Sequence, residues 1–315
     1  MAENIATRAA YGEALASLGA QYPDLIVLDA DLSGSTMSKK FAEKYPDRFF
    51  NLGIAEANMT GVAAGLAACG KIVFTNTFAM FAAGRAFEQV RNSIAYPRLN
   101  VKVIGSHGGL SVGEDGATHQ CIEDYALMRS IPGMVVLSPC DGPEMRRAVQ
   151  ALLDYDGPAY MRLGRLAVDS VTDSLPDDSF AIGKGVALRE GSDVTIVATG
   201  MMVQMALQAA ERLAPEGISA RVLDFHTIKP IDGELLERAA RETGAIVTTE
   251  EANVLGGLGG AVCEYLAGTC PVPVVRHGVQ DEFGRSGAAK QVLEAYGLTA
   301  GAIAAAARQA VAKKG

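Results

Sequence analysis

The sequence predicts an α/β protein of two domains, each built on a mainly parallel sheet flanked by helices. Three observations support this prediction. The chain has 315 residues, strand-like and helix-like segments alternate along it in two series, and a polar segment separates the two series. Such a length is enough for two domains, and this alternation is typical of parallel sheets covered on both faces. We expect domains at residues 1–170 and 191–315, joined by a linker at 171–190.

The first series begins with an Ala-rich helix and ends with an apolar strand. Short apolar runs bounded by turn residues predict strands, and longer periodic or Ala-rich stretches predict helices. The expected strands are 25–28, 48–52, 72–75, 101–104, 134–137 and 159–163. The expected helices are 5–19, 38–44, 55–68, 82–95, 121–129 and one from residue 143. Asn76-Thr77 is interpreted as a turn, and residues 105–118 as a long Gly-rich loop.

The second series follows a segment rich in Asp, Ser, Pro and Gly at residues 168–190. Such a composition, with few periodic apolar positions, is typical of an interdomain linker. The expected strands beyond it are 194–198, 220–223, 245–249 and 272–275. The expected helices are 202–213, 232–241, one after residue 260 and two at the C-terminal end.

Composition excludes several classes of protein. The 28 Lys and Arg stand against 36 Asp and Glu, a net charge of −8, which argues against a nucleic-acid-binding surface. The five cysteines form no Cys-x-x-Cys pair, so we expect reduced thiols, a cytoplasmic protein and no metal site in this chain. Residues 59–84 carry a single charge, but Gly70-Lys71 divides them into a helix and a strand, so we expect no membrane span.

The familiar nucleotide-binding motifs are absent from the sequence. The segment ANVLGGLGGAV (252–262) lacks the strict GxGxxG spacing directly after a strand, so a tight packing turn is favoured over nucleotide binding. GxxxxGK[ST] does not occur, which weakens the case for an NTPase.

The loop SHGGLSVGEDGATHQ (106–120) is the strongest candidate for a site. It holds two of the four histidines, His107 and His119, with two carboxylates and four glycines, after a predicted strand. Ligand sites of open α/β sheets lie at the carboxyl ends of strands. A solvated surface loop is the alternative, and metal binding lacks an evident third ligand.

Glu56 is the second candidate, a lone carboxylate among small and apolar residues at a predicted strand-to-helix junction. It is interpreted either as a first-turn glutamate favoured by the helix dipole or as a buried carboxyl kept partly protonated by desolvation. The nearby aromatics Phe78, Phe81 and Phe87 are at first sight core residues at helical spacing.

Taken together, these segments resemble the thiamine-diphosphate enzymes of the transketolase family. GIAEANM (53–59) resembles the motif around the family's activating glutamate, and GSHGGLSVGEDGATHQ (105–120) resembles its substrate loop. SDVTIVATG (192–200), LDFHTIKPID (223–232) and VTTEEANVLGGLG (247–259) resemble its C-terminal domain. The resemblance implies a pyrimidine-binding domain followed by a transketolase C-terminal domain.

The resemblance implies a role for Glu56 and a set of cofactor contacts. Glu56 would hydrogen-bond the aminopyrimidine ring of thiamine diphosphate and promote its activation, which works best from an apolar site. Phe78 and Phe81 match aromatic positions that pack on this ring, whereas the family's third aromatic has no clear match. The remaining cofactor-side matches are Asp31, Leu32, Ile54 and, from relatives with an Arg-Ala-aromatic-acid-Gln string, Arg85.

The resemblance also implies a substrate site. His107, Asp115 and His119 match residues that contact sugar hydroxyls and the reacting carbonyl, and both histidines are candidate catalytic residues.

Three further residues match the positions that hold a sugar phosphate, namely Arg8, Ser35 and Arg165. Arginine suits this task because its planar fork donates two hydrogen bonds to phosphate oxygens. Arg162 is an alternative to Arg165 as the phosphate ligand.

The family's diphosphate-binding domain is missing. That domain binds the diphosphate and Mg²⁺ (or Ca²⁺) through a GDG…N motif, which this sequence lacks; its only similar string is Glu114-Asp115-Gly116. The resemblance therefore implies the C-terminal subunit of a split transketolase. Its partners would be an N-terminal subunit with the GDG…N motif and a second copy of each chain, in an α2β2 heterotetramer.

The implied reaction is transfer of a two-carbon ketol unit from a ketose phosphate to an aldose phosphate. A deoxyxylulose-phosphate-synthase-like enzyme and a 2-oxoacid dehydrogenase β-type subunit remain alternatives on the same scaffold. From a different class, a non-catalytic regulatory partner subunit would keep the fold without the chemistry.

Overall fold

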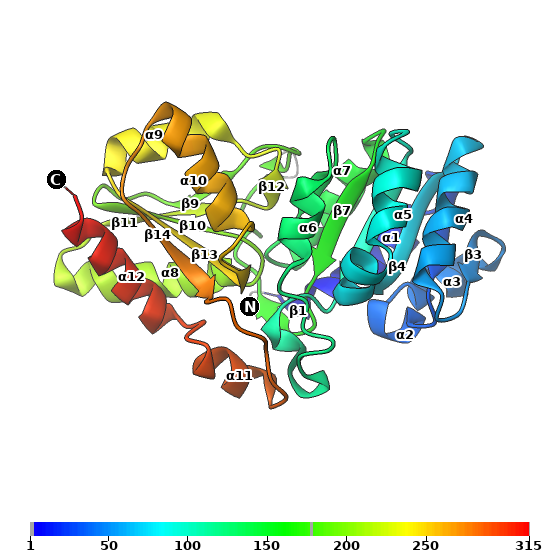
Figure 1. The fold of residues 1–315 in the computed structure, drawn as a ribbon, viewed down its shortest axis with the longest axis horizontal. Helices are drawn as coiled ribbons and strands as arrows, with labels where there is room; N and C mark the ends of the chain where they lie inside the picture. Colours follow the sequence, from blue (N-terminus) through cyan, green and yellow to red (C-terminus); the bar gives the residue numbers. More distant parts are fainter. Residues whose placement is uncertain (1–2, 177–178, 315) are drawn as a thin grey trace.

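The computed structural model describes residues 3–176 and 179–314 and shows two α/β halves side by side (Figure 1). The first half is built on a seven-stranded sheet of order β12-β6-β7-β5-β4-β2-β3, and the second on a five-stranded sheet of order β14-β13-β10-β11-β9. All neighbouring strands pair in parallel except β12 with β6 and β9 with β11. The predicted fold class is confirmed.

Between residues 4 and 169, eight strands and seven α-helices follow one another along the chain. They are β1 (Asn4–Ala6), α1 (Thr7–Leu18), β2 (Leu25–Asp29), α2 (Ser33–Thr36), α3 (Lys39–Lys44), β3 (Phe49–Asn51), α4 (Glu56–Ala68), β4 (Ile72–Phe78), α5 (Phe87–Gln89), β5 (Val101–Ser106), α6 (Asp124–Ser130), β6 (Val135–Leu137), α7 (Gly142–Asp154), β7 (Ala159–Leu163) and β8 (Ala167–Asp169).

The second half alternates in the same way. Its elements are β9 (Val186–Arg189), β10 (Val194–Ala198), α8 (Met202–Leu213), β11 (Ala220–Asp224), β12 (Thr227–Lys229), α9 (Gly233–Thr243), β13 (Ile246–Asn253), α10 (Leu258–Thr269), β14 (Val274–Val279), α11 (Ala289–Ala295) and α12 (Ala300–Ala312).

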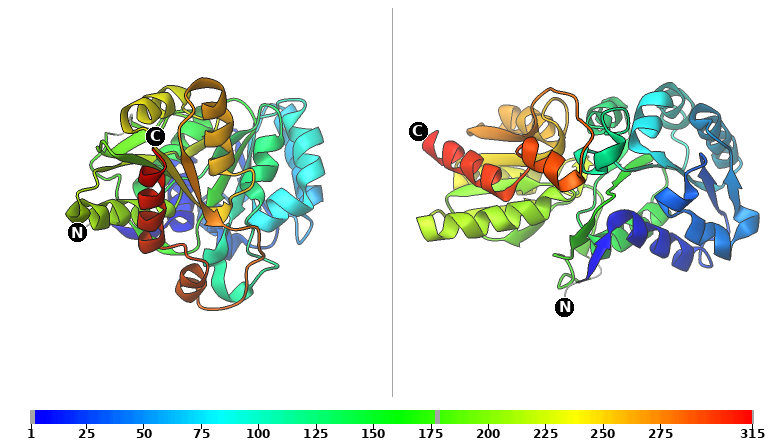
Figure 2. Two further views of the ribbon diagram at one scale, coloured as in Figure 1. Left: turned by 60° about the vertical axis from the view of Figure 1, so that its left-hand side comes forward. Right: turned by 90° about the horizontal axis from the view of Figure 1, so that it is seen from below.

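Helices cover both faces of each sheet, which explains why the central strands are almost continuously apolar. In the first half, α1 and α7 share one core with the sheet, and α4 lies in a second core on the opposite face. In the second half, α8 and α12 cover one face while α9 and α10 cover the other (Figure 2).

Three local predictions were wrong. Residues 5 and 6 belong to β1, which pairs with β8, so α1 begins at Thr7 rather than at residue 5. Asn76 and Thr77 form no turn but continue β4 to Phe78. The buried Asn76 side chain accepts from the Tyr11 hydroxyl and donates to the Leu28 carbonyl, so hydrogen bonding makes polar residues acceptable inside this strand.

The expected helix at 82–95 is also not regular. It consists of a π-helical turn at Phe81–Arg85, the short α5 and a second π-helical segment at Val90–Ala95. π-Bulges insert a residue into the helical ladder and are frequent at functional sites. Here the first one ends at Arg85.

The two halves are joined by more than the segment between them. Strand β12 lies in the second half of the sequence but pairs with β6 of the first sheet, a connection that the sequence patterns did not reveal. The expected linker at 171–190 contains the whole of β9 and includes residues 177 and 178, which lie outside the described residues.

Candidate functional site

Most of the candidate residues gather at one edge of the first sheet because they follow the carboxyl ends of parallel strands. Residues 31–35 follow β2, residues 54–56 follow β3, and Phe81 and Arg85 follow β4. His107 follows β5 and Arg165 follows β7. Since the carboxyl ends of parallel strands meet at the same edge, five distant parts of the sequence converge.

Glu56 is the first residue of α4 and its side chain is only 1% exposed. Both carboxylate oxygens accept hydrogen bonds from Nη1 of Arg85, at 2.9 and 2.8 Å. The Arg85 side chain is half-exposed, so this ion pair lies at the boundary between the core and the surface. Because Arg85 reaches the surface, a bound ligand can replace it as the partner of the buried Glu56 carboxylate.

Aromatic rings connect this ion pair with the histidine loop. The Arg85 guanidinium lies over the Phe81 ring, 4.3 Å from its centroid, and Phe81 is stacked near Phe78 at 6.1 Å between centroids. Phe78 in turn lies 4.2 Å from the His107 ring, and Phe81 lies 5.3 Å from the His119 ring. The two phenylalanines are therefore not isolated core residues but form one wall of the site.

His107 is held in an uncharged state. Its side chain is buried, its Nδ1 is 2.7 Å from the Ser106 hydroxyl, and its backbone is left-handed with φ of 59°. Burial, and then the positive charges of Arg8 and Arg165, lower the pKa of His107 to about 3. A neutral imidazole can donate or accept a hydrogen bond but carries no charge at neutral pH.

The two arginines near His107 lie at the rim of the site. Nη1 of Arg8 donates to the Ser35 carbonyl at 2.7 Å, and its buried Nε has no partner among the described residues. Arg165 donates from Nη1 to Glu114 at 2.7 Å and to the Val112 carbonyl. Two guanidinium groups that both act on one imidazole make this rim electropositive.

Arg162 is placed quite differently from Arg165. Its side chain is 5% exposed and donates to Asp124 from Nε at 2.8 Å and from Nη2, and to the Glu251 carbonyl from Nη1 at 2.8 Å. All its nitrogens are therefore occupied inside the protein. Arg165, about one third exposed, is the arginine that a ligand can reach.

The remaining predicted residues lie at the periphery of the site. Asp31 is exposed with φ of 65°, and the Leu32 amide donates to the buried Asp29 carboxylate at 2.6 Å. Ile54 is 76% exposed. Asp115 is exposed, and within the part of the chain that the structure describes it has no hydrogen bond to either histidine.

Comparison with family models identifies both halves of the chain. The transketolase pyrimidine-binding domain matches residues 3–170, and the transketolase C-terminal domain matches residues 183–303. The chain belongs to the transketolase family. It corresponds to the last two domains of that family.

Some relatives match almost the whole of this chain over almost the whole of their own length. A protein of Methanocaldococcus jannaschii described as a transketolase C-terminal section is 48% identical over 94% of this chain and 93% of its own length. A 6-deoxy-6-sulfo-D-fructose transketolase subunit of a Clostridium species is 49% identical over 94% and 91%. A solved structure described as a split gene transketolase, inactive β4 tetramer, is 53% identical with a TM-score of 0.92, covering 99% of this chain and all of the other.

The sequence analysis missed two residues that shape this candidate site. Asp29 is fully buried at the end of β2 and accepts from the Thr36 and Ser38 hydroxyls as well as from Leu32, so it fixes the loop that carries Ser35. Glu114 was noted only as a loop carboxylate, yet it pairs with Arg165. A carboxylate directly after a buried strand was the available signal for Asp29.

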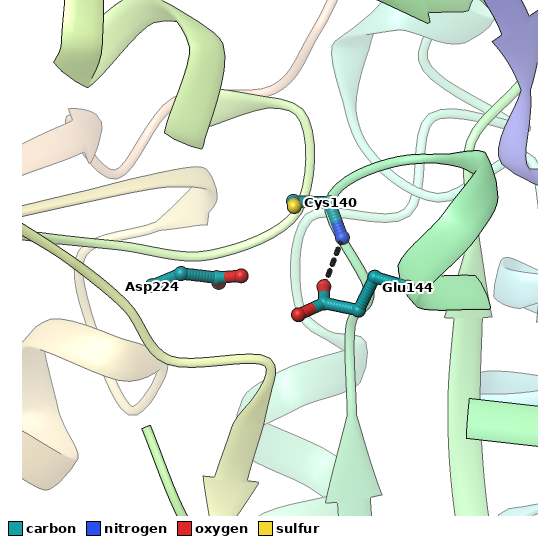
Figure 3. A group of neighbouring side chains, drawn as sticks. All are labelled: Cys140, Glu144 and Asp224. Atoms are coloured by element: carbon teal, nitrogen blue, oxygen red, sulfur yellow. Dashed lines mark hydrogen bonds between the residues drawn. The ribbon is translucent and has the colours of Figure 1, made fainter. Parts of the chain in front are cut away.

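A buried cluster with metal-ligand character lies outside this site, at the junction of the two halves. The side chains of Cys140, Glu144 and Asp224 bring one ligand atom each within 4.8 Å of the others (Figure 3). Glu144 accepts from the Cys140 amide at 2.7 Å, whereas both Asp224 oxygens have no partner among the described residues. Burial, and then Glu144, raise the pKa of Asp224 well above its usual value.

A single proton is sufficient to complete this cluster. A protonated Asp224 would be able to donate to Glu144, and the Cys140 thiol would be able to donate to the other Asp224 oxygen. Because hydrogen bonds then satisfy all three groups, the cluster calls for no metal ion and is interpreted as a structural contact between the halves.

None of the helices in the described ranges, 3–176 and 179–314, is both long and apolar enough to cross a membrane.

Proposed function

We propose that the chain is the subunit of a two-chain transketolase that activates thiamine diphosphate and binds much of the substrate. The reaction is transfer of a two-carbon ketol unit from a ketose phosphate to an aldose phosphate. The observation that carries the proposal is the continuous line from the Glu56–Arg85 ion pair through Phe81 and Phe78 to His107. It places a buried carboxylate, an aromatic wall and an imidazole at one edge of the sheet.

The residues on this line fit the aminopyrimidine end of thiamine diphosphate. A flat aromatic ring is suited to packing on Phe78 and Phe81, and Glu56 supplies a buried carboxyl for a ring nitrogen. Arg85 would leave one or both Glu56 oxygens when the ring binds. The bound cofactor supplies the carbon nucleophile, while this chain positions it and excludes water.

The rim of the site fits a substrate with a sugar ring or chain at one end and a dianion at the other. Neutral His107 can donate to or accept from a hydroxyl or carbonyl oxygen without charge, and the His119 ring packs edge-on against both phenylalanines of the aromatic wall. Arg8, Ser35 and Arg165 form the anion-binding end. A sulfonate is a monoanion, but its oxygens accept the same kind of charge-assisted hydrogen bonds as those of a phosphate, so both classes of sugar belong in the test.

The partner chain is proposed to bind the diphosphate and Mg²⁺ (or Ca²⁺) through a GDG…N motif, which this sequence lacks. The exposed side of α4 supports an interface beside Glu56. Ile54 and Val62 are exposed there, and a Cβ added at Gly61 or Gly65 would have no neighbour within 4 Å.

Such a flat apolar helix face is typical of a surface covered in an assembly. The similar split-gene structure, described as inactive, contains four β chains, which supports self-association together with a need for the second chain. The proposed assembly is an α2β2 heterotetramer in the cytoplasm. The five free cysteines are consistent with a reducing compartment.

Co-expression with the chain that carries GDG…N tests the proposal. The two chains are expected to co-purify and to transfer ketol units from one or more donors in a panel of ketose phosphates and 6-deoxy-6-sulfo ketoses, each with an aldose phosphate acceptor. Co-purification without turnover on any donor, while the complex binds thiamine diphosphate, would favour a regulatory subunit. Turnover of pyruvate instead of ketoses would favour the deoxyxylulose-phosphate-synthase-like alternative.

A further inference from the structure

The loop that carries both histidines, residues 105–121 (here the substrate loop), is built against the second half of the molecule. Within the first half, its base is closed by Gly109, whose amide donates to the Cys121 carbonyl at 2.7 Å, and by a bridge between Gly108 and Cys121. Between these points, the turn Leu110–Asp115 leaves the first sheet. Figure 1 shows this part of the loop next to α11 at the lower edge of the molecule.

Glu251 of β13 makes one direct contact between the second half and this loop. Its side chain is 6% exposed, and Oε1 accepts a hydrogen bond from the Ser111 amide. The loop also passes so close to this carboxylate that a Cβ added at Gly109 would lie 2.4 Å from it. Glycine is therefore required at this position twice, by the close approach and by its φ of 84°.

The first half fixes Glu251 in return. Nη1 of the buried Arg162 donates to the Glu251 carbonyl at 2.8 Å, while its Nε donates to Asp124. The first half thus fixes the Glu251 backbone, and the Glu251 carboxylate in turn fixes the substrate loop, which belongs to the first half. Burial raises the pKa of Glu251, although the Arg162 charge and the Ser111 amide oppose this shift.

A second contact lies at the other end of the substrate loop. Nε2 of Gln120, the neighbour of His119, donates to the Arg285 carbonyl at 3.0 Å and to the Gly113 carbonyl at 3.1 Å. Gly113 itself packs against Ala289, whose Cβ would be 3.1 Å from an added methyl group. The second half therefore contacts the loop close to His107 and again close to His119.

We propose that Glu251 is a positioning residue through which the C-terminal domain sets the place of the substrate loop, and with it of His107 and His119. The proposal rests on the function proposed above. It gives the C-terminal domain, none of whose described residues belongs to the aromatic wall or the arginine rim, a defined part in turnover. A shift of about 1 Å in a reacting group can cost on the order of 100-fold in rate, so a contact outside the site is sufficient.

Two substitutions of Glu251 test the proposal in the two-chain complex. Glu251→Ala removes the acceptor of the Ser111 amide, whereas Glu251→Gln keeps one oxygen in nearly the same position. We expect Glu251→Ala to lower kcat by about 10- to 100-fold and to speed hydrogen exchange at residues 109–113. The affinity for thiamine diphosphate should stay unchanged, and Glu251→Gln should recover much of the lost kcat.

Glu264→Gln is the matched control. Glu264 also joins the two halves, through an exposed ion pair with Arg129 at 2.8 Å, but it does not contact the substrate loop. Its substitution should leave kcat and hydrogen exchange in the loop at the wild-type level. An equal loss of kcat in Glu264→Gln would show general loosening of the halves and would overturn the proposal.

The remaining outcomes separate this proposal from the proposed function. If the wild-type complex transfers no ketol unit, the proposed function fails, whatever the variants do. If the wild type is active and folded Glu251→Ala keeps its kcat and its slow loop exchange, the positioning role is wrong while the proposed function stands. If Glu251→Ala does not fold, Glu251→Gln becomes the test. The proposal is then contradicted if Glu251→Gln loses all protection from hydrogen exchange at residues 109–113 and still keeps its kcat.

Discussion

Glu56 and Asp224 are both buried carboxyl groups, but the structure surrounds them in opposite ways. Glu56 is 1% exposed and has a cation, Arg85, whose side chain reaches the surface. Asp224 is 0% exposed and faces a second carboxylate, Glu144, and a thiol. The first arrangement lies at the ligand edge of a parallel sheet, and the second lies between the two halves.

The difference shows that burial alone does not mark a catalytic carboxyl. At the open edge of the sheet, a ligand can replace the cation that pairs with a buried carboxylate such as Glu56. A carboxyl closed in on all sides lowers its energy by keeping its proton, and it then acts as a hydrogen-bond donor that joins two parts of the fold. Substitutions at the two positions should therefore affect different properties of the protein.

The largest effect is expected for Glu56→Gln. Loss of the acid should lower ketol transfer by about 100- to 10,000-fold, the range for a group that transfers a proton, while the two chains still co-purify. Steady-state kinetics of the purified complex is the measurement. Glu88→Gln, an exposed change on the neighbouring α5, serves as the control, and near-normal turnover of Glu56→Gln would remove Glu56 from the chemistry.

A loss of about 100-fold in kcat/KM is expected for His107→Gln, because an amide replaces only part of the imidazole's hydrogen bonding. Since the pKa of His107 is about 3, the imidazole is neutral from pH 5 to pH 9. The pH profiles of the wild type and the variant should therefore have the same shape over this range. An inflection near pH 6 to 7 that disappears in the variant would show that His107 titrates during turnover.

The sequence was sufficient for the fold class and for the segments of the site, because apolar periodicity and loop composition are local properties. The ring contact of Phe78 with His107, by contrast, depends on two strands that meet only in the folded sheet. Whether Arg162 or Arg165 is the phosphate ligand depends on which of the two is buried. The sequence does not show this, because the two arginines lie close together in one apolar segment. β12 was missed because three residues without alternation give almost no local signal.

A moderate and selective effect is expected for Arg165→Ala. The KM for a phosphorylated acceptor should rise by about 10- to 100-fold, the equivalent of a lost hydrogen bond between charged groups, with less effect on an unphosphorylated one. Arg162→Ala should instead lower the melting temperature, because it leaves the buried Asp124 without its cation. An equal rise of KM for both acceptors in Arg165→Ala would contradict the assignment.

The smallest effect is expected for Asp224→Asn, and it concerns stability. In the unfolded chain this carboxyl ionises near pH 4, whereas burial raises its pKa in the folded state. The wild type therefore loses stability as the pH rises above about 4, by up to about 1.4 kcal/mol per pH unit until the folded-state pKa is reached. An amide does not titrate and can still donate to Glu144.

Melting temperatures at pH 5 and pH 8 check this expectation. Asp224→Asn should become more stable relative to the wild type at the higher pH, with turnover unchanged. A stability difference between the variant and the wild type that stays constant from pH 5 to pH 8 would show that Asp224 is ionised in the folded protein. Such a result would restore a bound cation as the explanation of the cluster.

The central claim is that this chain forms half of an active site. The most direct measurement titrates a fixed amount of the chain with its GDG…N partner, in saturating thiamine diphosphate and Mg²⁺, and follows ketol transfer. The account predicts no turnover by either chain alone and a rate that saturates at one partner per chain. Turnover by this chain without the partner would contradict it.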